Sequence, residues 1–432
     1  MVRFILMARI VVNATGFSGN FYPFLTLAKA LRQRGHAVTV ATGSHYYKEQ
    51  IENEGLEFYP LSEFLLPSKF DADPNLKNKI LYSKGNLKLL LKYRVLPNLQ
   101  NSFEELNAVC SGADLLISGV LPFAASLVHE KRKIKWISFC IHPPLFFSKD
   151  EIWPPKLWMA KIPLQFRRVF TLLSHVILRK QVDHWSKDWH QLRKNLGLIG
   201  TKNMLLDSIH SPMLQLAAFS KFIWPRQSDW PDHRKHVGFI RSPFVEMDLS
   251  TELKAFLAAG ESPFVFTMGG AASIFFGNQF FNMCLTIIQK QQIRAVFCCG
   301  EMEVTQELRE RVDKVPWVIL TGKEPFSKLF PYARAVIQHG GVGTIGEAII
   351  AGSPMLIVPG NAENPSNGLR ISFLKCGVCS GSKPISPRIF EKLLLKINQK
   401  QFRDSAQLLS AKVRTENGVE DSIFLIEEHL RK

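Results

Sequence analysis

The stretch VIQHGGVGTIGEAIIAG, residues 336–352, joins a short apolar run to a helix-like run through a turn that is rich in glycine. Ala335–Ile337 has the composition of the end of a buried strand, and Gly346–Ile350 has that of the start of a helix. The turn between them contains three residues without a Cβ atom, Gly340, Gly341 and Gly343. An anion can therefore come close to the backbone N–H groups at the helix N-terminus, and the stretch predicts a phosphate-binding turn.

Two polar side chains flank this turn. His339 is a hydrogen-bond donor within reach of a phosphate oxygen, and Glu347 is an acceptor in the first turn of the predicted helix. The alternative is a tight strand-to-helix turn that needs glycine only for its backbone angles. The two flanking side chains favour the phosphate site.

Length, charge and cysteine content limit the class of protein. A chain of 432 residues is about twice a typical domain, so we expect two domains. The net charge of +17, from 54 basic and 37 acidic residues, indicates an anionic partner such as a membrane surface, a nucleic acid or a nucleotide. The sequence contains no zinc-finger, basic-zipper or other nucleic-acid module, so we expect no nucleic-acid partner.

The seven cysteines form no paired framework, which favours a reducing compartment. Cys376 and Cys379 lack a second pair at metal-site spacing, so we expect them to be structural and expect no metal site. No run of about 18 apolar residues is present, which predicts that no helix spans a membrane. These features predict a cytoplasmic protein.

Alternating strands and helices occur in two blocks. The first 45 residues read as strand, glycine turn, helix and strand, which is a βαβ unit and implies a parallel sheet. A second alternation begins at 264–270, and the irregular segment 223–244 marks the joint. The predicted parts are an N-terminal domain over 1–235, a C-terminal domain over 236–415, and a helix in 416–432 that crosses back.

Ligands of open parallel sheets bind beyond the carboxyl ends of the strands. That rule places the turns at 16–20, 269–273 and 339–344 around one cavity, with Gly269 and Gly270 in the second turn. Neither of the first two turns fits G-x-G-x-x-G, so a dinucleotide-dependent oxidoreductase is not supported.

The segment HGGVGTIGEAIIAGSPMLIVPGNAENPSN resembles the donor-binding signature of GT-B nucleotide-sugar glycosyltransferases. In that signature His-x-Gly-x-x-Ser/Thr-x-x-Glu is followed, sixteen residues after its Glu, by an Asp/Glu-Gln pair. FSGNFYPFLTLAKALRQRGHAVTVAT resembles the family's N-terminal opening. Residues 210–239 are similar to rhamnolipid-type rhamnosyltransferases and to related lipid or sterol UDP-glycosyltransferases.

The resemblance implies an α/β fold of the GT-B type, with two Rossmann-like, doubly wound parallel-sheet domains that face each other across a cleft. It implies an inverting transferase that moves a hexose from a UDP- or dTDP-linked sugar without a metal cofactor. The N-terminal domain would bind the acceptor and the C-terminal domain the donor. By the resemblance, the donor's diphosphate contacts His339, Gly341 and Thr344, its ribose contacts Glu347, and its sugar contacts Glu363 and Asn364.

The sequence departs from the family pattern at the catalytic base. The family has Asp or His where this chain has Asn20, and an amide cannot accept a proton at neutral pH. The position expected to carry a supporting Asp is Gly119, and Asn364 replaces the Gln of the sugar-contacting pair. His142, after a predicted strand, is the best replacement for the base. The alternative function is a relative that binds nucleotide sugar without catalysis and serves as a partner or regulatory subunit.

Residues 156–180 contain six basic residues, no acidic residue and many large apolar side chains. Their apolar residues share one helix face, which suits either a helix on an anionic membrane surface or a helix packed on the domain core. Residues 75–94 form a second basic stretch without acidic residues. We therefore expect an apolar or lipid-like acceptor, and a peripheral association with the inner face of a membrane.

Overall fold

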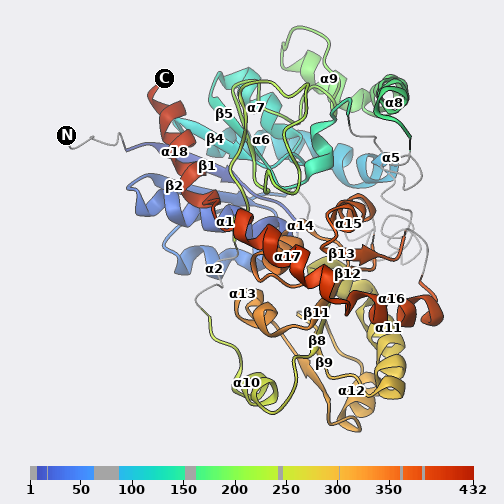
Figure 1. Cartoon of the computed structure of the whole chain (residues 1–432). Coiled ribbons are helices and arrows are strands. Elements are labelled where there is room, and N and C mark those ends of the chain that lie inside the picture. The colour runs from blue at the N-terminus through green and yellow to red at the C-terminus, as the bar shows by residue number, and fades with distance from the viewer. Residues whose placement is uncertain are drawn as a thin grey trace.

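The computed structural model of the chain describes residues 7–16, 18–62, 87–150, 162–241, 247–300, 302–360, 363–381 and 385–432. Within them, two parallel sheets are each flanked by helices, one in each half of the chain (Figure 1). Segment 75–86 and residues 156–161 of the predicted basic stretches lie outside the described residues.

The N-terminal half is built on a seven-stranded sheet in the order β3-β2-β1-β4-β5-β6-β7, in which every neighbouring pair is parallel. The chain order reverses at β1 and β4, so the carboxyl ends of these strands form a ligand-binding position. The strands are β1 (Arg9–Asn13), β2 (Ala37–Thr42), β3 (Glu57–Pro60), β4 (Leu115–Ser118), β5 (Lys135–Cys140), β6 (Leu214–Ala217) and β7 (Arg234–His236).

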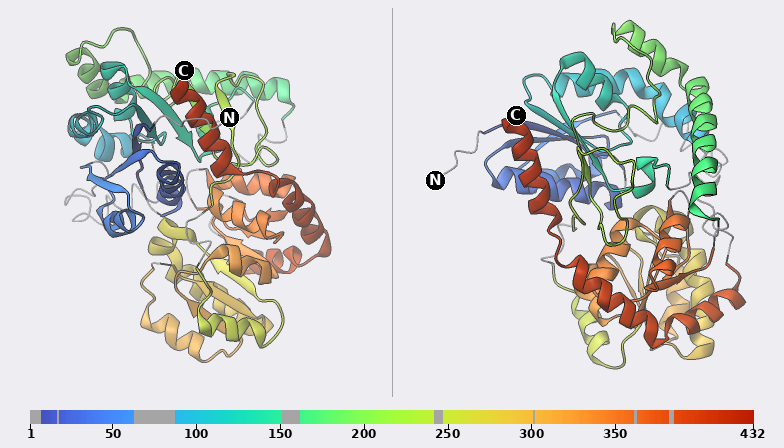
Figure 2. Two further views of the ribbon diagram at one scale, coloured as in Figure 1. Left: turned by 90° about the vertical axis from the view of Figure 1, so that its left-hand side faces the viewer. Right: turned by 45° about the horizontal axis from the view of Figure 1, so that its top comes forward.

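Helices cover both faces of this sheet. The longest, α8, lies on the outside of the N-terminal half in both views of Figure 2. The described helices of this half are α1 (Ser18–Gln33), α2 (Lys48–Asn53), α5 (Leu87–Leu90), α6 (Leu99–Val109), α7 (Ala124–Arg132), α8 (Leu164–Trp185) and α9 (Lys187–Asn195), with short turns η1 (His45–Tyr47), η2 (Leu91–Val95), η3 (Leu96–Asn98) and η4 (Pro143–Phe146).

The C-terminal half has a six-stranded parallel sheet in the order β10-β9-β8-β11-β12-β13. Its strands are β8 (Phe264–Thr267), β9 (Ala295–Cys298), β10 (Val318–Thr321), β11 (Ala335–Gln338), β12 (Met355–Ile357) and β13 (Gly377–Cys379). Its described helices are α10 (Thr251–Ala258), α11 (Gly269–Gln291), α12 (Gln306–Asp313), α13 (Phe326–Leu329), α14 (Val342–Ile350), α15 (Asn364–Phe373), α16 (Pro387–Ile397) and α17 (Lys400–Val413), with the turn η7 (Phe330–Tyr332).

The last helix, α18 (Gly418–Arg431), lies against the N-terminal half (Figure 1). Ile423 and Ile426 are buried in one apolar cluster with residues of β1 and α1. Lys135 Nζ donates a hydrogen bond of 2.9 Å to the carbonyl oxygen of Leu430. The C-terminal end of the chain thus packs on the half that contains the N-terminus.

The α/β class and the two doubly wound parallel sheets are confirmed. The central strands β1, β4 and β8 are almost entirely buried, as parallel strands covered on both faces are. Helix α14 begins at Val342 rather than Gly346, so Glu347 lies in its second turn and not in its first, as the sequence suggested. Among the described helices, none has the length and apolar content needed to span a bilayer.

Candidate active site

A cavity of about 330 Å³ lies between the two halves, where the carboxyl ends of several strands meet the start of α1. This is the position at which open parallel sheets bind ligands. All but one of the predicted site residues line it: Asn20, His142, Gly269, Gly270, His339, Gly341, Gly343, Thr344, Glu347, Glu363 and Asn364. The three predicted turns therefore meet at one cavity.

The His339 ring packs between two glycine backbones. A Cβ atom on Gly269, which has φ +65°, would lie 2.5 Å from His339 Cε1, and one on Gly341 would lie 2.6 Å from Nε2. His339 Nδ1 is buried and has no hydrogen-bond partner among the described residues. Burial lowers the pKa of His339 to about 4, against a smaller opposing effect of Glu363. The ring is therefore neutral at pH 7 and has one N–H group to donate to a ligand.

The start of α14 supplies backbone donors. Gly341 caps the helix, and Val342, Gly343 and Thr344 in its first turn all line the cavity. The first N–H groups of a helix have no acceptor within the helix, and the helix dipole favours an anion there. This end of the cavity can bind a phosphate.

Gly340 is the predicted site residue that does not line the cavity. It has φ +101°, its N–H donates to Gln338 Oε1 at 3.2 Å, and its carbonyl oxygen accepts from Asn367 Nδ2 at 2.9 Å. Gly340 thus shapes the turn instead of facing the ligand.

Glu347 is already paired in the structure. Arg241, in the segment between the halves, donates to both of its carboxylate oxygens at 3.2 and 3.0 Å. The Arg241 carbonyl oxygen accepts a hydrogen bond of 3.0 Å from Thr26 Oγ1 of α1. Arg241 was not predicted, and it connects Glu347, which lines the cavity, to the N-terminal half.

The structure brings together His142 and Glu363, which belong to different halves. His142 follows β5, Glu363 precedes α15, and Nδ1 of the histidine lies 3.0 Å from Oε1 of the carboxylate. Burial would raise the pKa of Glu363, but the charge and hydrogen bond of His142 outweigh it, and the pKa of the carboxyl is lowered. Because a carboxylate can only accept, Nδ1 of His142 carries the proton and Nε2 is the acceptor when the ring is neutral.

Asn20 and Asn364 line the same cavity from opposite halves. Asn20 lies in the first turn of α1, beside the turn residue Gly16. Asn364 is the first residue of α15, and a Cβ atom on Gly340 would lie 2.9 Å from its carbonyl oxygen. Neither amide can act as a base, whereas Nε2 of the neutral His142 ring can accept a proton.

Lys323 and Tyr22 complete the cavity, and sequence reasoning missed both. The Lys323 ammonium group donates to the Tyr22 hydroxyl and lies 4.6 Å from the centroid of its ring. Of the described residues that line the cavity, Lys323 is the only lysine or arginine. The one sequence signal that could have indicated Lys323 as a site residue is its position after the carboxyl end of β10.

Comparisons with known proteins match both halves. The model of the glycosyltransferase family 28 N-terminal domain matches residues 10–143. The model of the erythromycin biosynthesis protein CIII-like C-terminal domain matches residues 299–420.

Two curated relatives span nearly all of this chain. A sterol 3-beta-glucosyltransferase of Arabidopsis thaliana is 26% identical over 99% of this chain and 67% of its own length. An O-mycaminosyltylonolide 6-deoxyallosyltransferase of Streptomyces fradiae is 24% identical over 97% of each chain. Six fungal sterol 3-beta-glucosyltransferases are much longer, and the chain spans 26 to 29% of their length.

Solved structures share the fold. The glycosyltransferase of kitacinnamycin has a TM-score of 0.72 at 17% identity and covers 98% of this chain and 99% of its own. The glycosyltransferase VinC in complex with dTDP has a TM-score of 0.67 at 16% identity, over 98% of this chain and 100% of its own. With both domains matched and this fold shared, the chain belongs to the GT-B glycosyltransferases, a class of sugar-transferring enzymes.

Proposed function

We propose that the chain is an inverting transferase that moves a hexose from a UDP- or dTDP-linked sugar to a hydroxyl group of an apolar or lipid-like acceptor. The observation that carries the proposal is the pair of His142 and Glu363, 3.0 Å apart at a cavity that the glycine-rich turn at 339–344 also lines. A base and an anion site in one cavity are what sugar transfer from a nucleoside diphosphate requires.

The donor's diphosphate binds at the start of α14. The Lys323 ammonium group and the first-turn amides of α14 offset its charge, and the neutral His339 ring donates a hydrogen bond to it. These groups stabilise the leaving diphosphate by hydrogen bonds and charge, so the proposed reaction uses no metal ion. Glu347 accepts hydrogen bonds from the ribose hydroxyls after it has given up part of its pairing with Arg241.

His142 takes the proton in the transfer step. Nε2 of the neutral ring accepts the proton of the acceptor hydroxyl as that oxygen attacks the anomeric carbon. The bond between the anomeric carbon and the diphosphate oxygen breaks on the opposite face, which inverts the configuration and releases the nucleoside diphosphate. Glu363 holds the ring by its Nδ1–H and stabilises the imidazolium that forms. In this proposal the sugar hydroxyls contact Asn364 and the second oxygen of Glu363, and both residues line the cavity.

Helix α8 supports association with a membrane surface. Its large apolar side chains are exposed, with accessible fractions of 47 to 57%, and they are Phe166, Val169, Phe170, Leu172, Leu173, Val176 and Ile177. Burial of this face in the core, one of the two predicted arrangements, is wrong. Of the basic residues beside it, Arg168 and Arg179 are paired with Asp150 and Asp207, so apolar contact rather than charge would supply most of the affinity. We infer a cytoplasmic protein that rests on the inner face of a membrane through α8.

The test is a donor screen with UDP- and dTDP-hexoses, in which transfer to mixed lipids and donor hydrolysis are read by mass spectrometry. A sterol is the first acceptor to include, since the Arabidopsis relative is named for one. Binding of UDP and dTDP is measured beside it, and Asn20→Asp, which restores the family's residue, is the companion variant. If the wild type binds nucleotide but transfers nothing while Asn20→Asp is active, the chain is instead a relative that binds nucleotide sugar without catalysis.

A further inference from the structure

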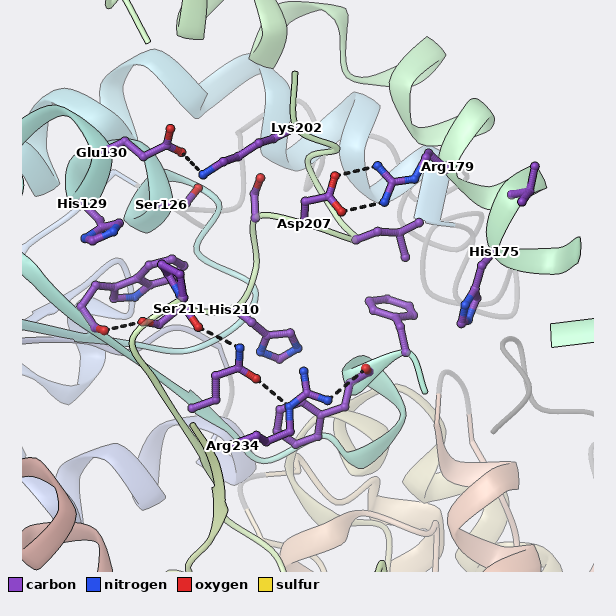
Figure 3. A pocket seen from close by; sticks show the side chains of 18 of the residues that line it. Ser126, His129, Glu130, His175, Arg179, Lys202, Asp207, His210, Ser211 and Arg234 are labelled. Carbon is purple, nitrogen blue, oxygen red and sulfur yellow. Dashed lines mark hydrogen bonds and ion pairs between the residues drawn. The ribbon is translucent and has the colours of Figure 1, made fainter. Parts of the chain in front are cut away.

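A second cavity, of about 450 Å³, lies within the N-terminal half (Figure 3). It is bounded by α7, α8, η4 and the β5 to β7 side of the sheet. It shares no lining residue with the candidate active site: His142, just before η4, lines the active-site cavity, and Phe146 and Phe147, at the end of η4, line this one. Its volume is within the usual range of ligand pockets, about 300–1,000 Å³.

A buried cation faces one end of this cavity. Arg234 is 8% exposed, its Nε donates to Gln215 Oε1 at 2.6 Å, and its guanidinium lies 4.1 Å from the ring centroid of Phe146. Burial lowers the pKa of Arg234 to about 10, so it is charged at pH 7. Within the described part of the chain, no carboxylate lies within ion-pair distance of it, although buried charges are normally paired.

The other charged groups of the cavity are matched among themselves. Asp207 accepts two hydrogen bonds of 2.6 Å from Arg179, and Glu130 pairs with Lys202 at 3.2 Å (Figure 3). Glu130 also pairs with Arg193, which does not line the cavity, at 2.7 Å. Both lining carboxylates are therefore taken up by cations other than Arg234.

The lining histidines add no charge at neutral pH. Burial is the main effect on His129, His175 and His210; it lowers the pKa of each, and that of His210 falls to about 3. The described lining residues thus leave Arg234 without an ion-pair partner. Asp229, which does not line the cavity, attracts its charge, but burial outweighs that effect on the pKa of Arg234, and the Asp229 carboxylate accepts hydrogen bonds from Ser148 Oγ and the Lys149 N–H.

Apolar side chains form much of the remaining wall, beside Ser126, Ser208 and Ser211, and they reach the protein surface. Phe146, Phe147, Leu206 and Pro212 line the cavity, and so do Leu172 and Val176 of α8. Leu172 and Val176 are also 53% and 55% exposed to solvent. The cavity therefore opens beside the exposed apolar face of α8.

We propose that this cavity binds an amphiphilic monoanion, a long-chain carboxylate, with its head group at Arg234 and its alkyl chain directed toward α8. The carboxylate supplies the missing ion-pair partner, and its bidentate geometry matches a guanidinium. The chain lies along Phe146, Leu172 and Val176 and is withdrawn from water. Because the site is separate from the active-site cavity, the inference does not depend on the proposed transfer reaction.

Calorimetric titration of the full chain with decanoate, below the concentration at which it aggregates, tests this site. We expect saturable binding of one decanoate, at least tenfold weaker binding of decan-1-ol, and no binding of acetate at the same concentrations. Arg234→Gln should weaken decanoate binding by about tenfold or more, because a charge-assisted contact is lost, while Arg234→Lys keeps more of the affinity.

A second pair of variants avoids the buried arginine. Val176→Trp places a large side chain at the cavity and should weaken decanoate binding, whereas Ile177→Trp, the equally exposed neighbour that does not line the cavity, should not. Non-saturable uptake, equal binding of decanoate and decan-1-ol, or equal affinity of the two tryptophan variants would overturn the proposal. Binding of acetate as tightly as decanoate would show a site for small anions and would overturn the proposal that the ligand is amphiphilic.

Discussion

The Glu363→Gln variant replaces the carboxylate that accepts a hydrogen bond from His142 Nδ1 at 3.0 Å by a neutral amide of similar size. The pKa of Glu363 is lowered in the folded protein, so the wild-type group is ionised at neutral pH. A hydrogen bond to a charged group contributes about 1.5–3 kcal/mol, which corresponds to about 10- to 150-fold. If this energy stabilises the imidazolium formed in the transition state, kcat should fall by that factor while the donor KM changes little.

The companion variant His142→Ala removes the base itself. General-base help is typically worth about a hundredfold or more, so kcat should fall by at least that much while nucleotide affinity is kept. In the proposed mechanism Glu363 acts through His142. Adding Glu363→Gln to His142→Ala should then cost little more, and the two losses should not multiply.

The assay is steady-state release of the nucleoside diphosphate at varied donor concentration and pH, with calorimetric titration of UDP and dTDP as the control for an intact donor site. Losses that multiply, with a raised donor KM in Glu363→Gln, would show that Glu363 acts only through the sugar and not through His142. Full activity of His142→Ala would refute the assignment of the base.

Three further predictions concern the donor site, the helix surface and stability. His339→Ala and Glu347→Ala should each weaken UDP or dTDP binding by about tenfold or more, as measured by calorimetry, and unchanged affinity in both would reject the donor site. The double variant Phe170→Ser with Leu173→Ser should bind anionic vesicles more weakly in sedimentation, whereas Leu408→Ser, at an exposed position of α17, should bind like the wild type. If all three sediment equally, α8 has no part in membrane binding. Burial lowers the pKa of His339 to about 4, whereas in the unfolded chain the ring keeps a pKa of about 6.5. The contribution of His339 to stability is therefore complete above about pH 6.5 and is lost as the pH falls toward 4, because the unfolded chain takes up the proton first. Between pH 7 and pH 5 the wild type should therefore lose about 2 kcal/mol more unfolding free energy than His339→Asn in chemical denaturation, and equal losses would contradict the burial of a neutral ring.

The sequence by itself determined the alternation of strands and helices, the two halves and the turn at 339–344. These features are encoded locally, by hydrophobic periodicity and by glycines where the backbone needs them, so neighbouring residues are enough to read them. Strands β3, β6, β7 and β13 were not predicted. They are three or four residues long, and β7 consists of Arg, Lys and His, so only pairing with an existing sheet edge makes them strands.

Tertiary structure alone decided which groups meet at the candidate active site. His142 and Glu363 are 221 residues apart, and Glu347 pairs with an arginine of the segment between the halves. Such contacts depend on how two separately encoded sheets face each other, and no local pattern records that geometry. The same holds for Arg234, a basic residue in an irregular stretch of sequence. The fold buries it at the wall of a cavity whose two lining carboxylates pair with other cations.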